Sequence, residues 1–247
     1  MNMLFSQTVE KTKKIKNKAL LLSTALLLST TSITQVQAQE LDIQVTNLTQ
    51  GIHFTPILIA AHDGDTKLFK SGEMASMALQ MMAEGGDISA LSAMLTTADK
   101  AENPAMGLLA PATSTSAMLS TMDANMYLSV VAMMLPTNDG FIGLNSWKIP
   151  SEAGTYSFTI NAYDAGTEAN DEMITGGGAP GAAGIPAAPG MNAGTDGTGV
   201  TMTEDNTYVH IHRGSLGDDD LTGGKSDLDN TVHRWLNPVA RITVTVN

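Results

Sequence analysis

Hydrophobic and polar positions alternate along much of the chain after residue 40, which predicts a mainly-β protein. Leu41–Val45 alternates with a period of two, and Phe54–Ala61 is an apolar run. Pro56 favours a strand that begins there or lies at a sheet edge, because proline has no N–H to donate. Further strands are predicted at 126–135, 141–149, 155–163, 208–212 and 238–246.

Two short helices are predicted before the main β region. Between Glu73 and Ala83, apolar residues recur at i, i+3, i+4 and i+7, and Gly85-Gly86 ends the run; these residues are Met74, Met77, Ala78 and Met81. A second helix is predicted within 88–97, with Asp87 as its N-cap. Residues 99–124, rich in Ala, Thr, Ser and Met, predict an irregular connection.

The segment 176–199 differs from the rest of the chain in composition. It contains nine Gly, six Ala and three Pro in 24 positions. Such a composition buries too little apolar surface to order the backbone. We therefore expect a flexible low-complexity loop. Because strands are predicted on both sides of it, we interpret it as an insertion within one domain at 39–247.

The first 38 residues indicate export. Five lysines lie within 11–18, an apolar run follows from Ala19 to Leu28, and Val36-Gln37-Ala38 provides small residues before a cut. This succession predicts a signal peptide at 1–38, cleaved after Ala38. A membrane anchor is the alternative, but a spanning helix needs about 20 apolar residues. We expect a secreted or periplasmic protein, with no transmembrane segment in the mature chain.

The net negative charge of the chain argues against some classes of binding partner. The formal net charge is −12, and without residues 1–38 the 8 basic and 24 acidic residues that remain give −16. This balance argues against nucleic acid or an anionic membrane, because both bind mainly through Lys and Arg. The absence of cysteine excludes disulfides, thiolate metal sites and cysteine nucleophiles.

The strands predicted at 126–135, 141–149 and 155–163 are joined by short turns and form an antiparallel meander. The first and third connections of a meander lie at the same end of the sheet. Asp139 belongs to the first connection, and Asp164 and Glu168 belong to the third. Gly166 lets the loop between Asp164 and Glu168 curl, so that both carboxylates can point at a common centre.

These three acids are candidate calcium ligands. Calcium takes six to eight oxygen ligands from carboxylates, backbone carbonyls and water, in flexible geometry. Two loop backbones and three carboxylates provide such a set. The alternative is that Asp139 shapes an Asn-Asp-Gly turn, while Asp164 and Glu168 are solvated loop charges.

Three other groups of residues are weaker candidates for ion binding. Asp218–Asp229 imitates an EF-hand loop, but Lys225 stands where an apolar residue is expected and Asp229 where Glu is usual, so a solvated acidic loop is the alternative. His210 and His212 face one side of a predicted strand, which suits zinc or copper if a third ligand joins them; otherwise they are structural. The eleven methionines from Met74 to Met134 suit Cu(I), or fill a core.

Catalysis has little support in the sequence. The chain contains no G-x-S-x-G and no H-E-x-x-H, and its Gly-rich stretch lacks the strand and helix that a phosphate-binding loop requires. We therefore expect a protein that is not an enzyme. The alternative enzyme would be a metal-assisted hydrolase that uses Asp139, Asp164 and Glu168.

Several blocks of sequence resemble the spondin N-terminal domain family. In order, they are Val45-Thr-Asn-Leu-Thr49, Phe54-Thr-Pro-Ile-Leu58 with His62-Asp63, Leu68-Phe-Lys-Ser-Gly-Glu-Met-Ala75, Ala83-Glu-Gly-Gly-Asp87, Pro136-Thr-Asn-Asp-Gly-Phe-Ile-Gly143, Tyr163-Asp-Ala-Gly-Thr-Glu168 and Asn237-Pro-Val-Ala-Arg-Ile-Thr-Val244. Each block alone is weakly specific, but their number and order make the resemblance fairly specific. It extends from about Leu41 to Val246.

The resemblance implies an antiparallel β-sandwich related in shape to C2 domains, and an adhesion or interaction role outside the cell. It also implies one Ca²⁺, held by acids that match Asp139, Asp164 and Glu168. The family usually has Asp at the position of Glu168, and its animal members have cysteines and further domains that this sequence lacks. The partner is expected to be an extracellular protein or glycan. The alternative function is a periplasmic copper- or zinc-binding protein.

Overall fold

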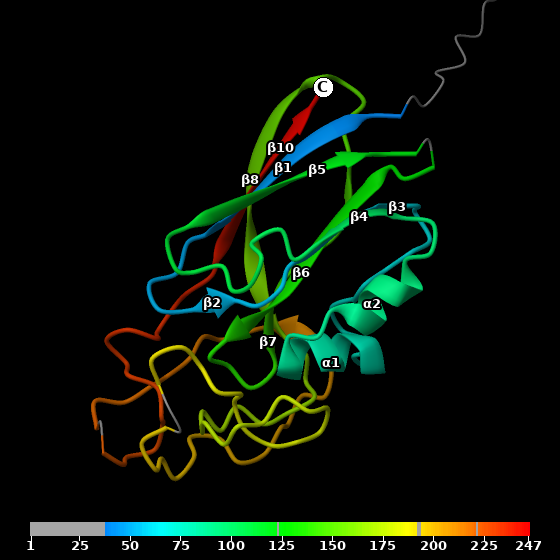
Figure 1. The fold of residues 1–247 in the computed structure, drawn as a ribbon. Coiled ribbons are helices and arrows are strands. Elements are labelled where there is room, and N and C mark those ends of the chain that lie inside the picture. The colour runs from blue at the N-terminus through cyan, green and yellow to red at the C-terminus, as the bar shows by residue number, and fades with distance from the viewer. Residues whose placement is uncertain (1–37, 123, 192–193, 221) are drawn as a thin grey trace, which may run out of the picture. The chain divides into compact units, whose positions relative to one another are not determined.

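In a computed structural model of the protein, the predicted strands join into an antiparallel sheet (Figure 1). The structure describes residues 38–122, 124–191, 194–220 and 222–247. The predicted signal peptide, 1–38, therefore lies outside the described residues except for Ala38. The elements are β1 (Glu40–Asn47), β2 (His53–Phe54), β3 (Leu58–His62), α1 (Met77–Gly85), α2 (Ser89–Met94), β4 (Asp99–Glu102), β5 (Ser114–Ser120), β6 (Tyr127–Leu135), β7 (Gly140–Lys148), β8 (Gly154–Asp164), β9 (His210–Ile211) and β10 (Ala240–Val246).

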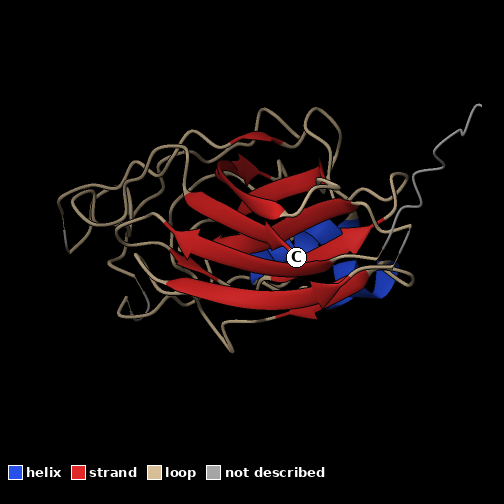
Figure 2. Cartoon of the chain, turned by 90° about the horizontal axis from the view of Figure 1, so that it is seen from above, coloured by secondary structure: helices blue, strands red, loops and turns tan. Residues whose placement is uncertain are grey.

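The strand order is β4-β3-β6-β7-β8-β10-β1-β5, with β2 also pairing with β6 and β9 with β8. Every strand pair in this sheet is antiparallel, so the predicted mainly-β antiparallel fold is confirmed. Figure 2 shows the strands as overlying layers, with most of the long loops at one end. The predicted meander is also confirmed, because β6, β7 and β8 are consecutive neighbours.

Strand β6 is a continuous apolar run from Val130 to Leu135 because both of its faces are buried there. Val130, Ala132 and Met134 point into a core that the strands of the two layers enclose. The alternate residues Val131, Met133 and Leu135 point into a second core, with which α1 and α2 also pack. A strand buried on both faces reads as a continuous apolar run rather than as an alternation.

Helix α1 begins later than predicted and buries a different face. The Ser76 hydroxyl caps it by accepting the Leu79 N–H at 3.1 Å, and Gly86, at φ 71°, ends it in the left-handed conformation. The buried residues include Leu79 and Met82, whereas Met77, which the periodicity placed on the buried face, is 65% exposed. Helix α2 begins at Ser89 with Ile88 as its N-cap, so the predicted N-cap, Asp87, is wrong by one residue; the Asp87 carboxylate still accepts the Ser89 N–H at 2.8 Å.

Two strands lie in the region predicted as an irregular connection, so that part of the prediction is wrong. Strand β5 pairs with β1, and strand β4 pairs with β3. Both are edge strands in the sheet order, so each has only one neighbour along it, and both are built from residues with weak strand preference. The single strand predicted at 54–61 is also two strands, β2 and β3, interrupted around Pro56.

The Gly/Ala-rich segment 176–199 is a loop with an apolar anchor that its composition does not predict. Ile185 is fully buried in the second core, and the segment forms a β-bridge there with Ile174. The Gly181 N–H also donates to the carboxylate of Glu84, at 2.6 Å. Ile185 therefore anchors the segment in the second core, while its flexibility and its place within one domain stay predictions.

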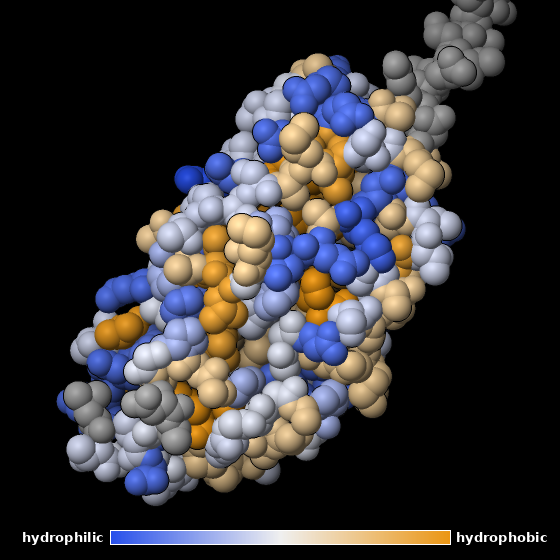
Figure 3. All heavy atoms as spheres, in the orientation of Figure 1, coloured by the Kyte–Doolittle hydropathy of each residue, from blue (hydrophilic) through white to orange (hydrophobic). Residues whose placement is uncertain are grey.

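Exposed hydrophobic residues are dispersed over the surface. On the face drawn in Figure 3 they lie in separate patches among hydrophilic residues. Scattered exposed apolar residues are normal on folded proteins and do not by themselves mark a binding face.

Within the part of the chain that the structure describes, no helix is both long enough and apolar enough to cross a membrane.

Candidate functional site

The ends of β6, β7 and β8 bring Asp139 and Asp164 together at one rim of the sheet. Asp139 lies in the turn before β7, and Asp164 ends β8. Gly140 pairs directly with Asp164, and the Ala165 N–H donates to the Asp139 carbonyl at 3.2 Å. The long loops that follow β8 gather at this same end, drawn yellow to orange in Figure 1.

The Asp139 side chain is completely buried and only half satisfied. Its Oδ2 accepts the Thr167 N–H at 2.8 Å and the Glu168 N–H at 3.2 Å, so the loop after β8 folds over it. Its Oδ1 is buried and has no hydrogen-bond partner. Burial raises the pKa of Asp139 well above its ordinary value, and the nearby charge of Asp164 acts in the same direction as the second cause.

Asp164 is held in place by its own loop. Its Oδ1 accepts the Gly166 N–H at 2.9 Å, and its Oδ2 accepts the Asn170 amide at 2.8 Å. Gly166 has φ 67°, and a Cβ there would come within 2.6 Å of the Asn206 carbonyl oxygen. The curl of this loop that the sequence predicts at Gly166 is therefore confirmed.

His210 and His212 lie on the same side, as their spacing predicts, and both face Asp164. Their Nε2 atoms lie 3.8 and 3.9 Å from Asp164 Oδ2. Their tautomers differ when neutral, because His210 Nδ1 lies 2.8 Å from the Tyr208 carbonyl and must donate, whereas His212 Nδ1 accepts the Gly214 N–H. The free lone pair is thus on Nε2 in His210, while His212 carries its proton there.

The burial of His212 keeps it neutral. Burial lowers its pKa to about 4, although the charge of Asp164 acts in the opposite direction. Its Nε2 is buried without a hydrogen-bond partner. The ring packs against Trp235 with centroids 4.9 Å apart, so His212 also serves as a wall of the site.

The carboxylate of Glu168, the third predicted ligand, has a different set of neighbours. Its Oε1 accepts the Asn138 amide at 3.3 Å and the N–H of Gly184 in segment 176–199. Burial raises the pKa of Glu168 to about 7, and the charges of Glu84 and Asp171 act in the same direction. The structure therefore brings Asp139 and Asp164 together, while Glu168 contributes its N–H to Asp139 and turns its carboxylate toward other acids.

Sequence reasoning missed several residues that shape this rim. Asn138 donates to Asp171 at 2.8 Å and accepts the Glu172 N–H at 3.2 Å, which ties the first loop to the third. Its position beside Asp139 in a turn was the available signal. Glu84, whose charge acts to raise the pKa of Glu168, lies in α1. Nothing in the local sequence connects that helix to Glu168.

Unpartnered buried atoms concentrate at this rim. Among the described residues, four buried side-chain polar atoms lack a partner, and three of them belong to Asp139, Glu168 and His212. Such atoms are costly unless water or an ion satisfies them. However, no group of three or more His, Cys, Asp or Glu side chains in the described part of the chain has an arrangement that could hold a metal ion. The calcium ligands therefore stay a prediction.

The other candidate ion sites have local structural roles. Asp218 Oδ2 accepts the Lys225 and Ser226 N–H groups at 2.7 and 2.9 Å, so it closes its own loop. Asp229 Oδ1 accepts the Thr231 N–H at 2.7 Å. Among the methionines, Met82, Met133 and Met134 are buried in the two cores. These contacts fit the structural alternatives.

The raised pKa of Glu168 predicts a pH dependence of stability in metal-free protein. Between pH 4.5 and 7 the folded state keeps a proton on Glu168 that the unfolded chain has lost. Its contribution is fully present below pH 4.5 and disappears as the pH rises to about 7. Buried histidines such as His212 give the opposite slope, so the measurement must compare wild type with Glu168→Gln.

Chemical unfolding of both proteins in chelator across this pH range tests the prediction. The unfolding free energy of wild type minus that of Glu168→Gln should fall as the pH rises and should level off above about 7. A difference that is constant with pH would mean that Glu168 titrates in the folded protein as it does in the unfolded chain.

Comparison with known proteins adds one finding. A family model described as Spondin_N matches residues 45–174, just over half of the chain. The match contains Asp139, Asp164 and Glu168 and ends before segment 176–199, so the blocks after residue 174 lie outside it. No curated protein matches the chain.

Proposed function

The chain belongs to the spondin N-terminal domain family, and from this premise we propose that it is an exported, calcium-binding adhesion or interaction module. Domains of this family are generally non-enzymatic and typically extracellular. In the proposal one Ca²⁺ is held by Asp139, Asp164 and Glu168, and the partner is an extracellular protein or glycan.

One observation carries the calcium proposal: two buried carboxylates meet at the rim, and one of them has an unpartnered oxygen. Asp139 and Asp164 are 0% and 2% exposed, and Asp139 Oδ1 has no donor. Bringing two carboxylate charges together in a poorly solvated site is unfavourable without a cation or a proton. A calcium ion would remove this repulsion and satisfy Oδ1 at the same time.

The proposed ligands fit calcium unequally. Asp139 Oδ1 and the oxygens of Asp164 would hold the ion, and the loop carbonyls and water would complete its shell. Glu168 holds Asn138 and Gly184 through Oε1, so its unpartnered Oε2 is the oxygen that would turn to the ion. When bound, calcium would supply positive charge that fixes the turn before β7 against the loop after β8. A partner would then meet a rigid rim.

A second candidate function is binding of a transition metal. It is favoured by His210, whose Nε2 lone pair faces Asp164 at 3.8 Å while its Nδ1–H donates to a backbone carbonyl. A metal-binding histidine commonly has this second hydrogen bond. Zinc or copper would use such a nitrogen donor, whereas calcium prefers oxygen.

Metal analysis of the native protein distinguishes the two functions and tests export. Protein should be recovered from outside the cells of its own host and purified without chelator. Its intact mass should match a chain that begins at Gln39. We expect about one calcium per chain, because one site is proposed. Stoichiometric zinc or copper would favour the second candidate. An intact mass that matches a chain beginning at Met1 would contradict export.

A further inference from the structure

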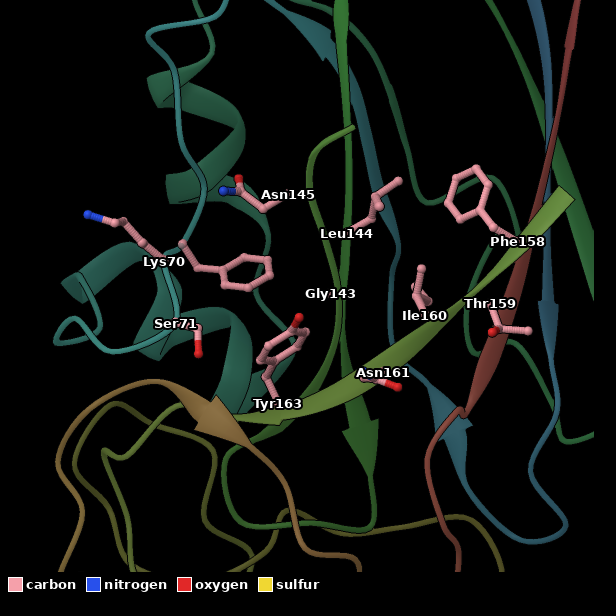
Figure 4. A pocket seen from close by; sticks show the side chains of 11 residues that line it. Lys70, Ser71, Gly143, Leu144, Asn145, Phe158, Thr159, Ile160, Asn161 and Tyr163 are labelled. Carbon is pink, nitrogen blue, oxygen red and sulfur yellow. The ribbon is translucent and has the colours of Figure 1, made fainter. Parts of the chain in front are cut away.

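A pocket opens where β8 separates from β7. These strands are nine and eleven residues long, but they pair only from Gly140–Asp164 to Gly143–Asn161. Beyond that point β8 pairs with β10 alone. The fork between the strands contains a pocket of about 350 Å³, a size typical of small-ligand sites (Figure 4).

A backbone pair limits this pocket at the closed end of the fork, and a pair of aromatic rings limits it toward the open end. At the closed end lies the last backbone pair, Gly143 with Asn161. Toward the open end, the ring of Phe158 lines the pocket and packs against Trp147 of β7, with centroids 4.8 Å apart. Because this ring pair bridges the two strands, the pocket suits a compact ligand better than an extended peptide added between them.

Gly143 is what makes room for the aromatic wall. A Cβ at this position would lie 2.6 Å from the Phe69 ring and 2.8 Å from the Tyr163 ring. Phe69 and Tyr163 pack together with centroids 4.9 Å apart, and both line the pocket. Figure 4 shows Tyr163 on the side of the pocket opposite to Phe158. The pocket is therefore walled by aromatic carbon on two sides.

Polar groups between these walls are available for hydrogen bonding. Asn161, Thr159 and Tyr163 line the pocket, and among the described residues no hydrogen bond occupies their side chains. Asn145 uses its Oδ1 to accept the Leu68 N–H at 3.2 Å, which leaves its amide donors for a ligand. Two amides and two hydroxyls thus offer both donors and acceptors.

The pocket has no unbalanced charge. No carboxylate lines it, although the chain has 25 acidic residues. Its single cationic residue, Lys70, forms an ion pair with Glu73. A charged ligand would therefore lose its hydration without gaining a free counter-charge.

We propose that this pocket binds one neutral sugar unit, such as the terminal residue of an extracellular glycan. The C–H face of a pyranose ring can pack on an aromatic ring, whose face carries partial negative charge, while its hydroxyls pair with amides and hydroxyls. The proposal goes beyond the calcium site and uses none of its ligands.

Protein-observed NMR tests this proposal with defined probes. The methyl β-glycosides of glucose, galactose, mannose and N-acetylglucosamine, and of glucuronic acid as a charged probe, are titrated into the full mature chain. At least one neutral glycoside should shift the amide signals of Gly143, Asn145 and Asn161 in a saturable way. The titration is run in calcium and in chelator, so that failure of the calcium proposal does not affect the result.

Two variants make the result specific. Asn161→Ala removes an amide from the pocket and should weaken binding at least tenfold. Ser157→Ala is the matched control, because Ser157 lies on the same side of β8 as Asn161 and outside the pocket. The proposal is overturned if no neutral glycoside shifts these signals, if glucuronide binds most tightly, or if Asn161→Ala binds as well as Ser157→Ala.

Discussion

Adding calcium to metal-free protein should raise its melting temperature, and Asp164→Asn should remove most of that rise. An ion that binds only the folded state stabilises it by about 2.7 kcal/mol when its concentration is one hundred times the Kd. Without calcium, the variant should be as stable as wild type or slightly more stable, because the repulsion between Asp139 and Asp164 is gone. Thermal unfolding with calcium and with chelator measures both effects.

Asp42→Asn is the control for this experiment. Asp42 is exposed on β1 and undergoes the same chemical change, so the variant should keep the full calcium-dependent rise. Equal rises in wild type and Asp164→Asn would place the ion elsewhere, with Asp218–Asp229 as the next site to test. No rise in any protein would leave Asp139 and Asp164 as structural acids.

Glu168→Gln in the same experiment decides whether Glu168 is a ligand. If its carboxylate turns to the ion, the variant should lose part of the calcium-dependent rise. If neither oxygen of the carboxylate reaches the ion, the rise should match wild type, and the ion would use Asp139 and Asp164 without Glu168.

Ile185→Ala should destabilise the protein by about 2–5 kcal/mol, the range for truncating a buried isoleucine. Ile185 is fully buried although it lies within the Gly/Ala-rich segment, so its truncation leaves a cavity in the second core. Ile211→Ala is the matched control, because Ile211 is 47% exposed and loses less buried surface. Chemical unfolding of the two variants provides the comparison.

If Ile185→Ala costs no more than Ile211→Ala, segment 176–199 does not pack against the core in solution. The expectation from composition, a flexible low-complexity loop, would then hold. A large cost would show that one apolar residue anchors the segment.

The order of β6, β7 and β8 and the meeting of Asp139 with Asp164 could be predicted because they follow from periodicity and turn positions. The edge strands β4 and β5 could not, since each has one neighbour and a composition of small or charged residues. The direction of the Glu168 side chain depends on Asn138 and on Gly184, sixteen residues later. Contacts between loops of this kind leave no local pattern in the sequence.

The histidines illustrate the same division. Their spacing predicts that His210 and His212 face one side, and both reach Asp164. Their different tautomers depend on contacts with the Tyr208 carbonyl and the Gly214 N–H, which are features of local backbone geometry. Which histidine nitrogen faces Asp164 as a lone pair therefore could not be predicted from the sequence.

The most direct test of the calcium site is a crystal structure of the protein grown with calcium, in which anomalous scattering locates the ion. We predict one ion at about 2.3–2.6 Å from Asp139 Oδ1 and from a carboxylate oxygen of Asp164, the usual calcium–oxygen distance. An ion bound only at Asp218–Asp229, or no ion at the rim in calcium-saturated crystals, would contradict the proposal.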